Sequence, residues 1–291
     1  MESVQKEALF VRNTIKLSAA AAVATATALA LSACSAPSDS KDSGDEDSAL
    51  IVAASPTPHG DILKFVKDNL AKKEDLKLEV KEFNDYNLPN TATENGEVGA
   101  NFFQHQPFLD EFNKKNGTHI VPIVNVQIEP LGLYSNKVKK LSDLGSGDSI
   151  ALPNDVSNEG RALKLLADNG LIELKPGVGS GATLKDVKDK KGLKLTELEA
   201  PQIPARLGDV DAAIINGNFA IGAKLKPATD ALALEKAENN PYANFLAVKK
   251  GKEDDPRVRK LAKLLNSPEV KKFIEDKYEG AVIPAFGAPK G

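Results

Sequence analysis

The chain contains 291 residues, of which 27% are charged and 41% are hydrophobic, and its formal net charge is -3. This composition is typical of a soluble protein with one large domain or two lobes. The near-neutral charge and the lack of a long basic block argue against nucleic-acid binding. The single cysteine, Cys34, excludes an internal disulfide and any cysteine-rich metal site.

The first 33 residues are typical of a targeting segment. Three basic residues precede an apolar, alanine-rich run over 17–31, which is shorter than the about 20 residues that span a membrane. Small residues directly before Cys34 resemble a bacterial lipobox, whereas the alternative is an ordinary buried cysteine. We predict a signal peptide over 1–33, lipidation of Cys34, and a protein anchored by lipid to the extracytoplasmic face of the cell membrane. The polar, acidic residues 34–48 predict a disordered tether.

The next segments alternate between strand and helix patterns. Asp61 is placed to cap a helix whose apolar residues are spaced by three and four. The predicted elements of this first unit are strands at 50–54, 76–83 and 119–126, with helices starting at 61 and covering 107–112. This order is βαβαβ-like and favours a mostly parallel sheet covered by helices.

A second α/β unit follows. It combines predicted strands at 149–152, 193–199 and 211–216 with a helix ending near Asn169 and a helical segment over 203–207. The last predicted strand, 245–248, precedes two helices that start at Asp255-Pro256 and Ser267-Pro268, each a capping side chain followed by proline. Two such units predict two lobes with a ligand cleft, because ligands of open α/β sheets bind beyond the carboxyl ends of strands.

Arg161 is the first candidate binding residue. It lies in SIALPNDVSNEGRALKLL, where the pattern predicts the first turn of a helix. A cation there is disfavoured by about 0.3–1 kcal/mol unless a negative group joins it. Either Asp155 or Glu159 neutralises Arg161, or an external anion such as a carboxylate binds its guanidinium.

Aromatic side chains form the second candidate site. Tyr86, Phe102, Phe103 and His105 are concentrated in FNDYNLPN and ANFFQHQPFLD, although the chain has only four Tyr and eleven Phe. They are suited to a pocket for an apolar, polarisable group such as a thioether, or else to ordinary core packing. Asn216 and Asn244 lie at strand ends, where an amide can bind an amino-acid backbone or cap a turn.

Catalytic motifs are missing from the sequence. The three histidines, His59, His105 and His119, are scattered, and there is no HExxH, GxSxG or phosphate-loop pattern. A metal site formed by His59, His105 and carboxylates is a minor alternative. We therefore predict no enzyme activity, no cofactor and no metal. The rival hypothesis is an exported hydrolase that uses His105.

Five separated motifs resemble one family, and they are FNDYNLPN, ANFFQHQPFLD, PNDVSNEGRAL, LKLTELEAPQIPARL and EGAVIPAF. From Leu50 to Phe286 the chain resembles the methionine-binding lipoproteins of ABC importers, the MetQ/NlpA family. The resemblance implies a two-lobed periplasmic-binding-protein-like fold with two crossover segments. It places lobe I at 49–130 plus 245–291, lobe II at 137–240, and the crossovers at 131–136 and 241–244.

The resemblance also implies roles for the candidate residues. Arg161 corresponds to the carboxylate-binding arginine, and the residues expected to hold the rest of the ligand are Tyr86, Phe103, His105, Asn216 and Asn244. Glu129 departs from the family, which often has a tyrosine before the proline there. Its carboxylate would favour a ligand ammonium or weaken an apolar pocket.

The expected function is therefore delivery of L-methionine to an ABC permease driven by its ATPase, with lobe closure by a hinge. The alternatives are binding of D-methionine or a methionine-containing dipeptide by the same fold, and a non-transport surface lipoprotein.

Overall fold

The computed structural model describes residues 45–289 except 180 and 239. All of them belong to one compact unit, Asp39–Gly291. The predicted signal peptide and Cys34 lie outside the described residues, as does most of the predicted tether. Within the described part of the chain, no helix combines the length and the hydrophobicity needed to cross a bilayer.

A six-stranded mixed sheet forms the first half of this unit, in the order β13-β4-β12-β3-β1-β2. Its strands are β1 (Leu50–Ala54), β2 (Leu78–Glu82), β3 (Ala100–His105), β4 (Ile120–Ile128), β12 (Asn244–Lys249) and β13 (Ile283–Gly287). β1 is parallel to β2 and β3, whereas β12 is antiparallel to β3 and β4, and β13 is antiparallel to β4. The predicted mostly parallel sheet is thus mixed, because the chain returns to it at its C-terminal end.

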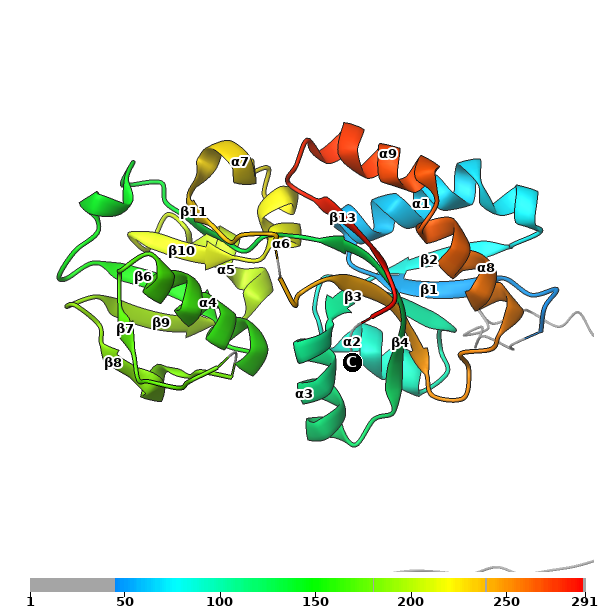
Figure 1. Ribbon diagram of the computed structural model, residues 1–291, viewed down its shortest axis with the longest axis horizontal. Coiled ribbons are helices and arrows are strands. Elements are labelled where there is room, and N and C mark those ends of the chain that lie inside the picture. Colours follow the sequence, from blue (N-terminus) through cyan, green and yellow to red (C-terminus); the bar gives the residue numbers. More distant parts are fainter. Residues whose placement is uncertain (1–44, 180, 239, 290–291) are drawn as a thin grey trace, which may run out of the picture. The chain divides into compact units, whose positions relative to one another are not determined.

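Helices cover both faces of this sheet (Figure 1). One face carries α1 (Asp61–Asn69), α8 (Pro256–Leu265) and α9 (Pro268–Tyr278), and the other carries α2 (Leu88–Glu94) and α3 (Gln106–Asn116). Asp255 and Ser267 cap α8 and α9 as predicted, because their side chains accept the backbone N–H groups of Arg257 and Val270.

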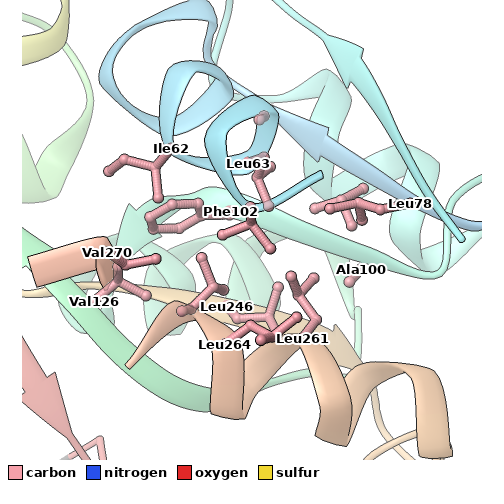
Figure 2. Close-up of a cluster of buried hydrophobic side chains, with 14 of the residues drawn as sticks. Ile62, Leu63, Leu78, Ala100, Phe102, Val126, Leu246, Leu261, Leu264 and Val270 are labelled. Carbon is pink, nitrogen blue, oxygen red and sulfur yellow. The ribbon is translucent and has the colours of Figure 1, made fainter. Parts of the chain in front are cut away.

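The main core lies between the first sheet and the layer of α1, α8 and α9. Figure 2 shows Phe102 and Leu246 from adjacent strands packed against Ile62 and Leu63 of α1 and Leu261 of α8. These five side chains are fully buried, and each such burial stabilises the fold by about 1.5–3 kcal/mol.

A five-stranded sheet in the order β11-β5-β10-β6-β9 forms the second half. Its strands are β5 (Gly132–Tyr134), β6 (Ser149–Pro153), β9 (Lys194–Leu198), β10 (Ala212–Ile215) and β11 (Ala231–Leu234). β6 is parallel to β9 and β10, and β5 is antiparallel to β10 and β11. The strand sequence alternates between two cores, since Ile150 and Leu152 pack in the cluster that contains α4, while Ala151 packs in the cluster that contains α5.

The remaining elements are shorter or cover this second sheet. Its helices are α4 (Val156–Asp168), α5 (Ile203–Arg206), α6 (Gly217–Gly222) and α7 (Pro227–Asp230), and a separate pair of short strands is formed by β7 (Glu173–Leu174) and β8 (Val187–Asp189). Single-turn helices occur at Pro56–Gly60, Ala71–Glu74, Leu141–Asp143, Leu184–Asp186 and Ala200–Gln202.

Two connections join the sheets. Residues 129–131 lead from β4 to β5, and residues 235–243 lead from β11 to β12. The connections are bonded to each other, because the Glu235 N–H donates to the Leu131 carbonyl oxygen at 2.9 Å. Each begins before the corresponding predicted crossover, 131–136 or 241–244, and overlaps it in part, because β5 is a strand of the second sheet and β11 ends at Leu234.

The end of the predicted tether contacts the folded unit. The Lys77 Nζ atom donates to the Asp47 carbonyl oxygen at 2.7 Å, and Arg257 Nη1 donates to Ser48 Oγ at 2.9 Å. Residues 47 and 48 are therefore part of the folded protein, and a tether would end before them.

Candidate functional site

A polar pocket is lined by residues from both halves of the unit and from the first connection. The lining residues are Tyr86, Phe103, Gln104, His105, Phe108, Glu129, Asn158, Arg161, Asn216, Gly217, Asn218 and Asn244. The void between them measures about 350 Å³ with its open mouth, but the cavity left for a water-sized body is only about 20 Å³. All six residues predicted to bind a ligand border this pocket. His105 and Asn216 stand at or just beyond the carboxyl ends of β3 and β10, where ligands of α/β sheets bind.

Arg161 differs from its predicted environment. α4 begins at Val156, so Arg161 lies in its second turn and not in the first. Asp155 caps the helix by accepting the Asn158 N–H at 3.1 Å, and Glu159 accepts the Leu184 N–H at 2.7 Å. Neither predicted local acid pairs with Arg161, because both are used by backbone donors.

Glu235, which the sequence analysis did not consider, is the partner of Arg161. The Arg161 Nε atom donates to Glu235 Oε1 at 2.9 Å, and Nη2 donates to Glu235 Oε2. Nη2 also donates to the Glu129 carbonyl oxygen at 3.0 Å, and the guanidinium lies over the Tyr242 ring with Cζ 4.1 Å from its centroid. Among the described residues, Nη1 has no hydrogen-bond acceptor. The guanidinium is therefore held from three sides, with one amino group left for the pocket.

An amide pair lies next to the arginine. The Asn216 Nδ2 atom donates to Asn158 Oδ1 at 3.0 Å, and His105 Nε2 lies 3.3 Å from the same oxygen. His105 Nδ1 accepts the Phe108 N–H at the start of α3, so the proton of this ring is on Nε2. Burial, and then the charge of Arg161, lower the pKa of His105 to about 3. His105 is thus a neutral donor at physiological pH, and the buried Asn216 Oδ1 atom accepts no hydrogen bond from a described residue.

Glu129 forms a second polar group with His59. His59 Nε2 lies 3.1 Å from Glu129 Oε1 and 2.9 Å from Asn244 Oδ1, and Gln127 Nε2 donates to Glu129 Oε1 at 3.0 Å. Burial raises the pKa of Glu129 to about 8 and lowers the pKa of His59 to about 4. Both side chains are consequently uncharged near neutral pH. His59, which the sequence offered as a metal ligand or a turn residue, does not line the pocket but contacts two residues that do, Glu129 and Asn244.

Gly217 makes room for this carboxylate. A Cβ atom at Gly217 would lie 2.7 Å from the Cβ of Glu129, closer than real side chains approach. The glycine-rich sequence after Asn216 therefore has a packing reason, since it lets α6 begin directly against Glu129.

Aromatic side chains form an apolar wall of the same pocket, here called the aromatic wall. Tyr86, Phe103 and Phe108 pack with ring centroids 5.7–6.1 Å apart, and Phe219 lies 5.1 Å from Tyr86. The Tyr86 hydroxyl donates to Asn218 Oδ1 at 2.6 Å, which bonds a residue preceding α2 to one in α6. These rings form an apolar surface suited to a hydrocarbon or thioether group.

The sequence candidate Phe102 does not belong to this wall. It is fully buried in the main core and points toward His59, with ring centroids 4.7 Å apart. Its neighbour Phe103 faces the pocket because successive side chains of a strand point to opposite faces. The core-packing alternative is correct for Phe102, whereas Phe103 both packs in a buried cluster with Phe108 and Phe112 and lines the pocket.

Several lining residues were not identified from the sequence, and they are Gln104, Phe108, Asn158, Gly217 and Asn218. Asn158 and Phe108 could have been found, because each lies in the first turn of a helix that directly follows a strand. For the metal alternative, no group of three or more His, Cys, Asp or Glu side chains able to hold an ion occurs among the described residues.

Two α/β halves joined by two connections, with an arginine and an apolar wall around one pocket, define a two-lobed binding protein for small molecules. The family model of the NlpA lipoproteins matches residues 50–286. The chain belongs to this family of substrate-binding lipoproteins, as the sequence motifs predicted.

Named relatives agree with this assignment. The methionine-binding lipoprotein MetQ of Bacillus subtilis is 43% identical over 241 residues, covering 81% of this chain and 87% of the relative. A nutrient-binding protein from Burkholderia cenocepacia, solved bound to methionine, has a TM-score of 0.79 at 45% identity, covering 82% of this chain and all of that one. A periplasmic substrate-binding protein of an ABC transporter from Coxiella burnetii has a TM-score of 0.77 at 40% identity, covering 81% of this chain and all of that one.

Proposed function

We propose that the protein is a lipid-anchored, substrate-binding lipoprotein that binds L-methionine and delivers it to an ABC permease. The observation that carries this proposal is the placement of the Arg161 guanidinium and the wall of Tyr86, Phe103 and Phe108 around one pocket. An amino acid with an apolar side chain has the same division, with charge at one end and hydrocarbon at the other.

The ligand carboxylate would bind Nη1 of Arg161. This amino group is the part of the guanidinium that no described residue accepts from, and a charge-assisted hydrogen bond is about twice as strong as a neutral one. The adjacent His105, a neutral Nε2 donor, adds a second polar group on the same side.

The ligand ammonium would bind at Glu129 and Asn216. The Asn216 Oδ1 atom is a buried acceptor with no described donor, and Glu129 lines the same pocket. An ammonium has three donors, so it can serve both oxygens at once. Binding would favour the ionised form of Glu129, because the ligand supplies the positive charge that its surroundings lack.

The thioether would lie on the aromatic wall. Sulfur–aromatic contacts contribute about 0.3–1.5 kcal/mol, and alanine has no side chain long enough to form them. The cavity, about 20 Å³, has room for little more than a water molecule, so it holds neither a single amino acid nor a dipeptide as it stands. It therefore requires that the two halves separate for the ligand to enter, by bending in the connections 129–131 and 235–243.

The family relationship supports the transport step. A lipid on Cys34 would hold the protein beside the permease, with the residues before 47 as its tether. The relative from Coxiella burnetii is named as part of an ABC transporter, which makes the same partner the best candidate for this chain.

Calorimetric titration tests the ligand. Residues 35–291 would be unfolded, washed and refolded, because a tightly bound amino acid can copurify. L-methionine should bind one-to-one and more tightly than alanine, D-methionine or a glycyl-methionine dipeptide. Tighter binding of D-methionine or of the dipeptide would identify that compound as the ligand of the same site. No binding of any of these compounds would contradict the proposal. For the transport step, labelled methionine uptake should fall in cells carrying Cys34→Ala.

A further inference from the structure

Glu235 stands outside the pocket but controls the residue expected to hold the ligand carboxylate. It lies at the start of the second connection, directly after β11, and its side chain is 17% exposed, against 4% for Arg161. It does not line the pocket. Its contact with the ligand would therefore be indirect, through the arginine.

The position of the Glu235 carboxylate is fixed by both connections. Its Oε2 atom accepts the Leu131 N–H at 3.2 Å, and its own backbone N–H donates to the Leu131 carbonyl oxygen. The carboxylate occupies the Nε and Nη2 edge of Arg161, which is the edge that would otherwise bind a carboxylate with two hydrogen bonds. A ligand carboxylate is thus left with the Nη1 end.

The charges around Arg161 indicate which ligands the site prefers. Glu129 and His105 are uncharged near neutral pH because burial shifts their pKa values to about 8 and about 3. The charges of Arg161 and Glu235 cancel each other within their ion pair. Because Glu235 already neutralises Arg161, this subsite has no net positive charge that would favour an anionic ligand over a zwitterion.

We infer that Glu235 is a positioning residue that also sets the charge preference of the site. It holds Arg161 so that only Nη1 serves the ligand, and it opposes the attraction between the guanidinium and the ligand carboxylate. The site therefore prefers a zwitterionic amino acid to an anionic ligand. This inference rests on the proposed role of Arg161 in binding a carboxylate.

The test compares L-methionine with L-methioninamide, which keeps the ammonium and the thioether but has no carboxylate. Dissociation constants for both ligands would be measured at pH 7 on the purified protein, freed of bound ligand by unfolding and refolding. The variant Glu235→Gln keeps an acceptor for Arg161 Nε and removes the charge. We expect the ratio of the methioninamide to the methionine dissociation constant to rise about tenfold in this variant, because the bare guanidinium attracts the carboxylate more strongly.

The control is Asp255→Asn, which removes a charge from a similarly buried arginine pair far from the pocket. Arg257 and Asp255 have side-chain exposures of 4% and 10%, and their closest N–O distance is 2.6 Å. This variant should leave the ratio unchanged. Should Glu235→Gln not refold, Glu235→Met removes the same charge at a similar volume and has the same expected result.

A ratio that stays within twofold of the wild-type value would overturn the inference, since a merely structural role would weaken both ligands equally. A ratio that falls would also overturn it, because Glu235 would then strengthen the grip on the carboxylate. A wild-type protein that fails to prefer methionine over its amide is a different outcome. That outcome would contradict the proposed function, and the inference with it.

Discussion

Two buried clusters of polar side chains lie next to each other in this protein, and they differ in how completely they are hydrogen-bonded. The first, here called the amide network, consists of Asn90, Thr93, Asn101 and Gln104. The Asn101 Nδ2 atom donates to Thr93 Oγ1 at 2.8 Å, and Gln104 Nε2 donates to Asn90 Oδ1 at 2.7 Å and to Asn101 Oδ1 at 2.9 Å. Every buried side-chain oxygen and nitrogen of this network has a partner.

The second, here called the pocket cluster, consists of His59, Gln127, Glu129, Asn158, Arg161 and Asn216. Three of its buried atoms, His59 Nδ1, Gln127 Oε1 and Asn216 Oδ1, have no hydrogen-bond partner among the described residues. A buried polar atom left unpaired costs about 1–3 kcal/mol. The amide network therefore stabilises the joint between α2 and β3, whereas the pocket cluster keeps an unpaired oxygen, Asn216 Oδ1, on a residue that lines the pocket, where an amino acid can bond to it.

The largest effect is expected from Arg161→Ala. The substitution removes the donor for the ligand carboxylate, and loss of one partner of a buried charge pair costs about 2–5 kcal/mol. L-methionine affinity should fall by about 100-fold or more in calorimetric titration. A change in affinity of less than about threefold, in a variant whose thermal unfolding shows it to be folded, would show that Arg161 does not bind the ligand.

The two clusters predict opposite results for two asparagine substitutions. Asn101→Ala removes three buried hydrogen bonds, to Asn90, Thr93 and Gln104, and should lower the free energy of unfolding by about 2 kcal/mol. Asn216→Ala removes one unpaired oxygen and one hydrogen bond, to an Asn158 oxygen that His105 also reaches, so its stability loss should stay below about 1 kcal/mol while methionine affinity falls about tenfold. Denaturant titration and calorimetry on both variants measure the two quantities. Similar stability losses for both would erase the distinction between the clusters.

The pocket cluster also predicts a pH dependence that the amide network cannot have. Burial raises the pKa of Glu129 to about 8, so the folded protein keeps a proton that the unfolded chain releases above about pH 4.5. The free energy of unfolding should therefore fall as the pH rises from about 5 to 8, by at most about 1.4 kcal/mol per unit from this group. His59 has the opposite sign below its ordinary pKa, because it is buried neutral and the unfolded chain gains the proton.

Comparison with Glu129→Gln isolates the Glu129 contribution. The variant cannot ionise, so its unfolding free energy should decline less than that of the wild type between pH 6.5 and 8. Methionine affinity should rise more than tenfold from pH 6 to 8 in the wild type and stay flat in the variant, since the ammonium binds the ionised carboxylate. Parallel pH profiles for the two proteins would exclude Glu129 as the ammonium acceptor.

The smallest effect is expected from Phe103→Ala. Phe103 contributes one ring of the aromatic wall, with Tyr86 and Phe108 remaining. Methionine affinity should fall about fivefold and alanine affinity less than twofold, because only methionine reaches the wall. Competition titration with both amino acids measures the difference. An equal loss for the two ligands would place Phe103 in the support of the pocket and not in contact with the side chain.

Much of the fold was predictable from local pattern. β1, α8 and α9 match their predicted positions closely, because apolar spacing and capping residues specify them within a few residues of chain. α1 begins at Asp61 as predicted, but Asp61 does not cap it, because its carboxylate accepts from Thr57 and Tyr278 instead. β3, β5, β11 and β13 were missed. β5 and β11 are only three and four residues long, which is too short to show a pattern. β3 is buried on both faces and mixes Asn and Gln with Phe, so it lacks the alternation of a half-exposed strand.

The candidate site was also predictable in part. The motifs predicted six residues that border the pocket, and the family resemblance suggested their roles. The pairing of Arg161 with Glu235 could not be predicted, because the two residues are 74 positions apart and meet only through the pairing of β5 with β11. The position of Arg161 in the helix was also misjudged by one turn, since Asp155 and not a later residue caps α4.

The measurement that tests the account most directly is a crystal structure of the washed and refolded protein with L-methionine. We predict one methionine in the pocket, with a carboxylate oxygen about 3 Å from Arg161 Nη1, the ammonium at Glu129 and Asn216, and the sulfur on the rings of Tyr86 and Phe103. Arg161 should keep its bonds to Glu235. Methionine bound with its carboxylate away from Arg161, or with Glu235 displaced from the guanidinium, would contradict the assignment of the pocket cluster.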